Sequence, residues 1–205
     1  MSVALPWTRL NRLAAALNCG TRGQLLALGG LVCLLLLPQL GGEAWRSLLA
    51  YDRTGIAAGQ WWRLLSAHMV HLGPQHALLN CAGLLLLWAL FARDYGAAGW
   101  AAIVFAAAAA IDAGLWYRDL TVEWYVGSSG VLHGALAAGV LAQLRRGEPQ
   151  GWLLAAFLVL KLGYEQQVGA LSLMRGGAVI VDAHLYGAAG GLCAAAVLAR
   201  VSKPL

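Results

Sequence analysis

The sequence predicts an all-α polytopic membrane protein. Of its 205 residues, 60% are hydrophobic and only 11% are charged, whereas a soluble globular domain carries about a quarter charged residues. Long intervals without a formal charge recur along the chain, and a helix that crosses a bilayer needs roughly 20 predominantly apolar residues. Glycine is frequent, at 26 residues, and small residues inside apolar runs are typical of closely packed membrane helices. These observations argue against a soluble protein.

Six transmembrane helices are predicted from these intervals. The interval 64–92 is too long for one helix, so its first part, up to Gly73-Pro74, is interpreted as a surface loop that leads into the second helix. The first apolar stretch is long for the core of a signal peptide, and no small-x-small cleavage site follows it. We predict an N-terminal segment 1–23, a membrane domain 24–200 and a tail 201–205, with helices at about 24–40, 75–93, 96–116, 128–144, 151–171 and 179–200.

The fifth predicted helix contains two charged residues. Lys161 and Glu165 are four residues apart, so they share one helix face and can pair. Such a pair either only allows the helix to insert or has a function inside the membrane. The sequence leaves both interpretations open.

The basic residues predict the orientation of the helices, because cytoplasmic loops carry an excess of lysine and arginine. With a cytoplasmic N-terminus, both termini face the cytoplasm, and that side holds Arg9, Arg12, Arg22, Arg93, Arg145, Arg146, Arg200 and Lys203. The opposite side holds fewer basic residues, namely Arg46, Arg53, Arg63, Arg118 and Arg175, and acidic residues balance them. The net charge of +5 is therefore a topology signal, and the lipid bilayer is the expected partner rather than nucleic acid.

Four polar residues in the predicted helices are candidates for chemistry, since the membrane makes an unpartnered polar group costly. Ser129 and His184 each lie 16 residues before the arginine that ends the same helix, so both stand about 24 Å from the cytoplasmic boundary. His76 and Asn80 reach nearly the same level in the second helix. A serine or a histidine taken alone is more often structural, and only the combination favours a catalytic site.

The helix that contains Ser129 begins late, so its N-terminus is expected to lie in a recessed cavity that opens outward. Two GxxxG ridges, Gly130 with Gly134 and Gly187 with Gly191, allow this helix to approach the helix of His184. A histidine held against a serine hydroxyl can take the proton as the oxygen attacks a carbonyl. The oxyanion that forms needs hydrogen-bond donors, which the Ser129 backbone amide, His76 and Asn80 could supply.

At these residues the chain resembles the rhomboid family of intramembrane serine proteases, over about residues 59–200. Gly127-Ser128-Ser129-Gly130 resembles the family's GxSG motif, His76 to Asn80 resembles HxxxN, and Ala183-His184 with Gly187 and Gly191 resembles AHxxGxxxG. Residues 59–68, GQWWRLLSAH, are similar to the Trp-Arg region of the first external loop.

The resemblance implies a six-helix rhomboid-like bundle and assigns roles to the matching residues. Ser129 is the nucleophile and His184 the general base in a dyad without a catalytic acid, and no cofactor is needed. The oxyanion hole consists of His76, Asn80 and the Ser129 backbone amide.

Within the family, the short chain, the bare six-helix core and the stretches GSSGVLHG and DAHLYG look most like the rhombosortase branch. This resemblance implies a bacterial inner-membrane enzyme whose site opens to the periplasm. Its substrates are membrane-anchored proteins with a GlyGly-CTERM tail, a Gly-Gly pair followed by a transmembrane helix and a basic cluster. The acyl-enzyme reacts either with water or with a cell-envelope amine. The alternatives are a general rhomboid protease with broader substrates, a non-catalytic rhomboid-like binding protein, and a transporter or channel.

Other polar residues allow more than one role. His133 lies one turn after Ser129 and is structural, tunes the serine or contacts substrate. Trp62 and Arg63 belong to the first external loop and are candidates for substrate contact or tuning of the site. Trp62 either anchors the loop in the interface or gates substrate entry. Asp182 lies two residues before His184 and does not share its face, so it is a poor third triad member. The role of Asp112, which ends an alanine-rich run, stays open.

No metal site is predicted. His68 and His71 are interpreted as loop residues, and with His76 they lack a thiolate or carboxylate that would complete a ligand set. The cysteines occur singly, without CxxC spacing, and are interpreted as small packing residues: Cys19, Cys33, Cys81 and Cys193.

Overall fold

The computed structural model describes residues 22–170 and 179–201, and the described chain is mostly helical, as predicted. Several expectations lie outside the described residues. They concern the segment 1–21, residues 171–178 and the tail 202–205, and with them Arg9, Arg12, Cys19, Arg175 and Lys203.

The N-terminal part of the described chain is one long apolar segment with a break. α2 (Arg22–Leu36) continues into a 3₁₀ helix, η1 (Leu37–Gly41), and then into α3 (Gly42–Leu49). The first predicted helix is therefore interrupted, because Pro38 lacks the N–H of an α-helical hydrogen bond and its ring clashes with the preceding turn. The whole stretch Gly23–Leu49 is still long and apolar enough to cross a membrane.

Short elements form a cap on one end of the bundle: β1 (Tyr51–Asp52), α4 (Arg53–Ala57) and α5 (Arg63–Ser66). β1 pairs antiparallel with β2 (Trp124–Tyr125), so the described chain departs from an all-α protein at these two-residue strands. Arg53 fastens the cap, because its guanidinium donates hydrogen bonds to backbone carbonyls near the end of α7, those of Leu115, Trp116, Asp119 and Val122.

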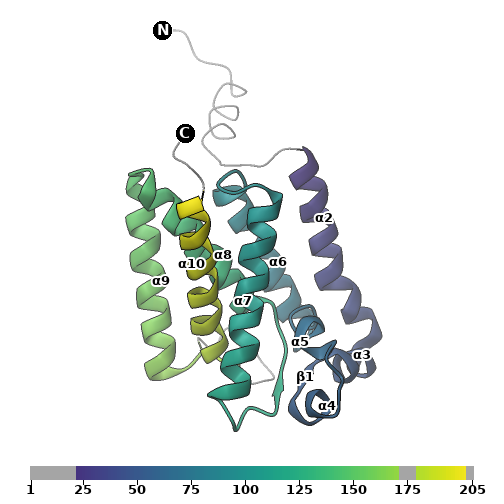
Figure 1. Cartoon of the computed structure of the whole chain (residues 1–205). Coiled ribbons are helices and arrows are strands. Elements are labelled where there is room, and N and C mark those ends of the chain that lie inside the picture. The colour runs from purple at the N-terminus through teal and green to yellow at the C-terminus, as the bar shows by residue number, and fades with distance from the viewer. Residues whose placement is uncertain (1–21, 171–178, 202–205) are drawn as a thin grey trace.

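Longer helices form the rest of the bundle (Figure 1). They are α6 (Pro74–Phe91), α7 (Ala97–Tyr117), α8 (Ser129–Arg145), α9 (Pro149–Val168) and α10 (Asp182–Val201). Their ends differ from the predicted bounds by a few residues where a local signal decides the end. A proline occupies the first turn of α6 and of α9, where its missing N–H is harmless. Gly169, at φ +94°, lets the chain leave α9 in a backbone conformation that favours glycine.

Within the described residues, four helical segments are long and apolar enough to cross a membrane, which makes the chain an integral membrane protein: Gly23–Leu49, Pro74–Phe91, Ala97–Tyr117 and Asp182–Val201. α8 and α9 are not among them. α8 has only 17 residues, and α9 contains Lys161 and Glu165.

α8 lies at the centre of the bundle. It packs against α6, α7, α9 and α10, and ten of its 17 residues are buried. The outer helices expose large apolar side chains, such as Leu26 of α2, Phe105 of α7 and Leu160 of α9, as expected for surfaces that face lipid. The N-terminus of α8 lies inside the protein, since both neighbours of Ser129 in the chain, Ser128 and Gly130, are buried.

Candidate active site

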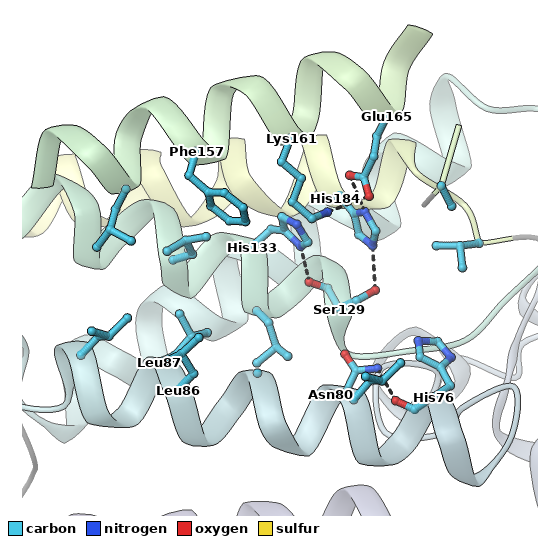
Figure 2. A pocket seen from close by; sticks show the side chains of 18 residues that line it. His76, Asn80, Leu86, Leu87, Ser129, His133, Phe157, Lys161, Glu165 and His184 are labelled. Atoms are coloured by element: carbon cyan, nitrogen blue, oxygen red, sulfur yellow. Dashed lines mark hydrogen bonds and ion pairs between the residues drawn. The ribbon is translucent and has the colours of Figure 1, made fainter. Parts of the chain in front are cut away.

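Ser129 and His184 are in hydrogen-bond contact. Ser129 is the first residue of α8 and His184 lies in the first turn of α10, and Ser129 Oγ is 2.8 Å from His184 Nε2 (Figure 2). His184 is only 5% exposed. A serine hydroxyl at this distance can donate its proton to the imidazole.

Glycines bring the two helices together. A Cβ added to Gly187 would lie 2.0 Å from the carbonyl oxygen of Gly130, and one added to Gly191 would lie 2.3 Å from that of Gly134. Backbone therefore packs directly on backbone, as in membrane helices with small-residue interfaces. This close approach lets the short side chain of Ser129 reach His184.

The second ring nitrogen of His184 is also bonded. His184 Nδ1 lies 2.9 Å from Glu165 Oε2, and Glu165 Oε1 lies 2.7 Å from Lys161 Nζ (Figure 2). Glu165 and Lys161 both belong to α9. The pair that the spacing predicted within this helix is present, and its carboxylate also reaches a second helix.

His133 packs flat against His184. The ring centroids are 4.3 Å apart and the ring planes differ by 16°, while His133 Nδ1 lies 2.7 Å from the backbone oxygen of Ser129 one turn earlier. Nδ1 donates this bond, because a carbonyl oxygen can only accept. His133 therefore limits the rotation of the His184 ring.

A cavity of about 350 Å³ opens beside these residues. Its polar end is lined by Ser129, His184 and Glu165, and its apolar part lies between α6, α8 and α9. The apolar lining consists mainly of leucines, with Phe157 from α9. The cavity is therefore suited to an apolar chain segment whose backbone reaches Ser129.

Two further polar residues of α6 line the cavity, and both are at most 5% exposed. His76 Nδ1 accepts a bond from the Leu72 backbone N–H at 3.4 Å, so its proton is on Nε2, which can donate. Asn80 Nδ2 donates one bond to the His76 backbone oxygen at 2.9 Å, and the amide has a second N–H. Both side chains lie beside the start of α8, whose first-turn amides have no partner within the helix.

Gly127 makes room for the His76 ring. Its φ is +126°, and a Cβ there would lie 2.9 Å from His76 Cε1. We expect Gly127→Ala to displace His76 and to lower the cleavage rate by about tenfold or more, since one oxyanion donor contributes on the order of 10²-fold. The rate should be compared with that of Gly96→Ala, because a Cβ at Gly96 meets no atom within 4 Å. An unchanged cleavage rate in Gly127→Ala would show that His76 does not stabilise the oxyanion.

The loop residues that the sequence singled out do not line this cavity. Arg63 is buried, and its guanidinium donates to the carbonyl oxygens of Ser47 and Ala50, each at 2.8 Å. Trp62 donates through Nε1 to the Leu48 oxygen at 3.3 Å. Both side chains therefore hold the cap against the end of α3 rather than contact the site.

The two loop histidines are buried in separate contacts. His68 Nε2 lies 3.3 Å from the Asp112 carboxylate of α7. His71 Nε2 lies 3.2 Å from Ser128 Oγ, and burial together with the neighbouring His76 lowers the pKa of His71 to about 3. His71 is therefore neutral at physiological pH and braces the serine that precedes α8.

Among the residues that the structure describes, His133, Glu165 and His184 form a group compact enough to hold a metal ion, with ligand atoms within 4.8 Å of one another. The ammonium of Lys161 already neutralises Glu165, and both ring nitrogens of His184 have hydrogen-bond partners. The arrangement therefore suits proton transfer better than metal binding.

The contact of Glu165 with His184 is the feature that the sequence interpretation missed. Asp182, which was considered as a third member, begins α10, and the carboxylate beside His184 comes from α9 instead. A signal was present, since Glu165 lies 16 residues after Pro149, the first residue of α9. This count equals the one that placed Ser129 and His184 at one level.

The chain is similar to known proteins. The family model described as "Rhomboid domain" matches residues 58–201, a range that contains α6 to α10 and all the site residues above. A Bacillus subtilis (strain 168) protein named "Putative rhomboid protease YdcA" is 26% identical over 156 residues, which cover 76% of this chain and 76% of that protein.

Proposed function

The chain belongs to the rhomboid family of intramembrane proteases, and we propose that Ser129 is its nucleophile and His184 its general base. The contact of 2.8 Å between Ser129 Oγ and His184 Nε2 carries this proposal. Ser129 Oγ attacks the scissile carbonyl carbon as its proton passes to His184 Nε2. When the C–N bond breaks, the same nitrogen gives this proton to the leaving amine, and an acyl-enzyme remains.

The oxyanion of the tetrahedral intermediate is bound by the Ser129 backbone amide and the side chains of His76 and Asn80. The Nε2 proton of His76 and the second amide N–H of Asn80 support this role. Donors that are fixed before the reaction stabilise charge as it develops.

The substrate is a membrane-anchored protein with a Gly-Gly pair before its C-terminal transmembrane helix, as in the rhombosortase branch. The stretches GSSGVLHG and DAHLYG support this choice. Paired glycines weaken a helix, so such a segment can unwind and present an extended backbone to a recessed serine. Water or a cell-envelope amine then attacks the acyl carbon, and His184 accepts the proton of the attacking group.

The protein crosses a bacterial inner membrane six times, with both termini cytoplasmic and the site open to the periplasm. This topology counts α8 and α9 as spans in addition to the four long apolar segments. The first residue of α2 and the last of α10 lie at the same end of the bundle (Figure 1), as an even number of crossings requires. The excess of basic residues at that end supports a cytoplasmic location.

A reporter with a GlyGly-CTERM tail tests the substrate assignment. The reporter is produced with the enzyme in the membrane, and the new C-terminus is identified by mass spectrometry. We expect cleavage near the Gly-Gly pair and a loss of about tenfold or more when the pair is changed to Leu-Leu, because the restored helix resists unwinding. An added mass on the new C-terminus would identify transfer to an amine.

A general rhomboid protease with broader substrates is the second candidate. The predominantly apolar cavity between α6 and α9 favours it, since such a lining accepts many transmembrane segments. Cleavage of the Leu-Leu reporter at the rate of the Gly-Gly reporter would support this candidate and contradict the GlyGly-CTERM assignment.

A further inference from the structure

We propose that Glu165 positions His184 for catalysis and that, with Lys161, it extends the Ser129–His184 pair into a hydrogen-bonded chain of four residues. This inference rests on the proposed function, because it assigns a role within the same site. It also replaces the dyad without an acid, which the family resemblance implied, by a serine, a histidine and a carboxylate with its own counter-ion.

The carboxylate of Glu165 uses one oxygen for each partner. Oε2 is 2.9 Å from His184 Nδ1 and Oε1 is 2.7 Å from Lys161 Nζ. The side chains of Glu165 and His184 are 4% and 6% exposed, so water does not compete strongly for either bond. The geometry therefore fixes the imidazole from its far side.

This contact selects the tautomer that the reaction needs. A carboxylate only accepts, so His184 Nδ1 must carry the proton that it donates to Glu165. The lone pair of Nε2 then faces Ser129 Oγ at 2.8 Å and is free to receive the hydroxyl proton. The opposite tautomer would place an N–H against the serine and block this step.

Glu165 also stabilises the charged state of the histidine. Proton transfer from Ser129 leaves an imidazolium, and a carboxylate at Nδ1 favours that state where both side chains are buried. In the resting site the ammonium of Lys161 balances the carboxylate, which makes a buried charge tolerable inside the membrane domain. Lys161 and Glu165 together thus carry no net charge before His184 is protonated.

A pair that only allowed α9 to insert would need no contact outside that helix. Lys161 and Glu165, four residues apart, already form an ion pair with each other. The second carboxylate oxygen of Glu165 nevertheless accepts a hydrogen bond from His184 of α10. The other titratable groups that face His184 are His133 of α8, stacked on its ring, and His76 of α6. From α7, Asp112 pairs with His68 instead.

The variants Glu165→Gln and Lys161→Met separate the two roles. In Glu165→Gln the carbonyl oxygen faces the retained ammonium, so the amide N–H₂ faces Nδ1 and favours the wrong tautomer. We expect kcat to fall by about 10²-fold with little change in KM. The control Glu148→Gln makes the same change just before α9, at a half-buried carboxylate that pairs with Arg146 rather than with His184, and should leave kcat unchanged.

The double variant Lys161→Met/Glu165→Gln removes both charges and keeps α9 insertable, so it tests the proposal even if a single variant fails to fold. We expect it to stay at least about tenfold below wild type in kcat, with normal amounts of protein in the membrane. If the pair served insertion alone, the double variant would cleave at the wild-type rate. A wild-type rate in the double variant, in an assay in which Ser129→Ala is inactive, would overturn the role of Glu165 and leave the proposed function intact.

The pH profile of kcat/KM provides a readout that a merely structural pair would not move. The reaction needs neutral His184, and the negative charge of Glu165 favours the protonated ring. The acidic limb of the kcat/KM profile is therefore expected at lower pH in Glu165→Gln. It is expected at higher pH in Lys161→Met, where no ammonium balances the carboxylate of Glu165. Unmoved limbs in both variants would contradict the proposal, whereas cleavage by Ser129→Ala would contradict the proposed function itself.

Discussion

Replacing Ser129 with alanine is expected to lower the cleavage rate by at least about 10³-fold while the protein still accumulates in the membrane. Ser129→Ala removes the oxygen that His184 contacts at 2.8 Å and leaves the helix interface intact. His184→Ala should reduce the rate to a similar level, because members of one catalytic unit are not additive. The rate is measured on the GlyGly-CTERM reporter in detergent, with both variants checked for normal thermal unfolding.

Ser128→Ala is the matched control for this prediction. Ser128 precedes Ser129, and its hydroxyl bonds to His71 rather than to His184. We expect the control to keep its rate within about tenfold of wild type, since it loses one neutral hydrogen bond. If Ser128→Ala were inactive and Ser129→Ala active, the nucleophile would be Ser128 and the assignment of Ser129 would be wrong.

Gly187→Val is expected to abolish the folded site. A Cβ alone at this position would lie 2.0 Å from the Gly130 carbonyl oxygen, so α8 and α10 must separate. Such overpacking destabilises a protein by about 3 kcal/mol or more when backbone blocks relaxation. We expect less protein in the membrane, a lower unfolding temperature in detergent and no cleavage.

Gly163→Val tests whether the effect of Gly187→Val comes from the helix interface. Gly163 lies in α9, and a Cβ there meets no atom within 4 Å. The control should therefore unfold at nearly the wild-type temperature and cleave at nearly the wild-type rate. Equal unfolding temperatures for both variants would show that α8 and α10 do not pack through this ridge.

Much of the site could be predicted because its residues obey helical geometry. Ser129 and His184 each lie 16 residues before an arginine, Arg145 or Arg200, near the end of the same helix, and glycine ridges on both helices indicate close packing. The helical rise per residue therefore predicts that Ser129 and His184 lie at the same depth, and the glycines predict that their helices pack closely. Both inferences need only the sequence.

The contact of Glu165 with His184 could not be predicted in the same way. The i, i+4 rule pairs Lys161 with Glu165 but does not say which neighbour the shared face meets, because that depends on the rotation of α9 about its axis. This rotation is set by packing against α8 and α10. A count from Pro149 places Glu165 at the right level, yet level alone does not choose a partner.

The cap was the least predictable part of the fold. Pro38 explains the break after α2, and its effect is local. The pairing of β1 with β2 joins segments more than 70 residues apart, and neither two-residue strand has a periodic pattern. Arg53 was interpreted as a topology marker, whereas its guanidinium ties the cap to the end of α7.

Covalent labelling of the purified protein tests the central claim most directly. A fluorophosphonate probe reacts with a serine that a base activates, and the labelled peptide is identified by mass spectrometry. The account predicts one adduct on Ser129 in the wild-type protein and none there in His184→Ala. Labelling of Ser129 that is unchanged in His184→Ala, or an adduct on Ser128 instead, would contradict it.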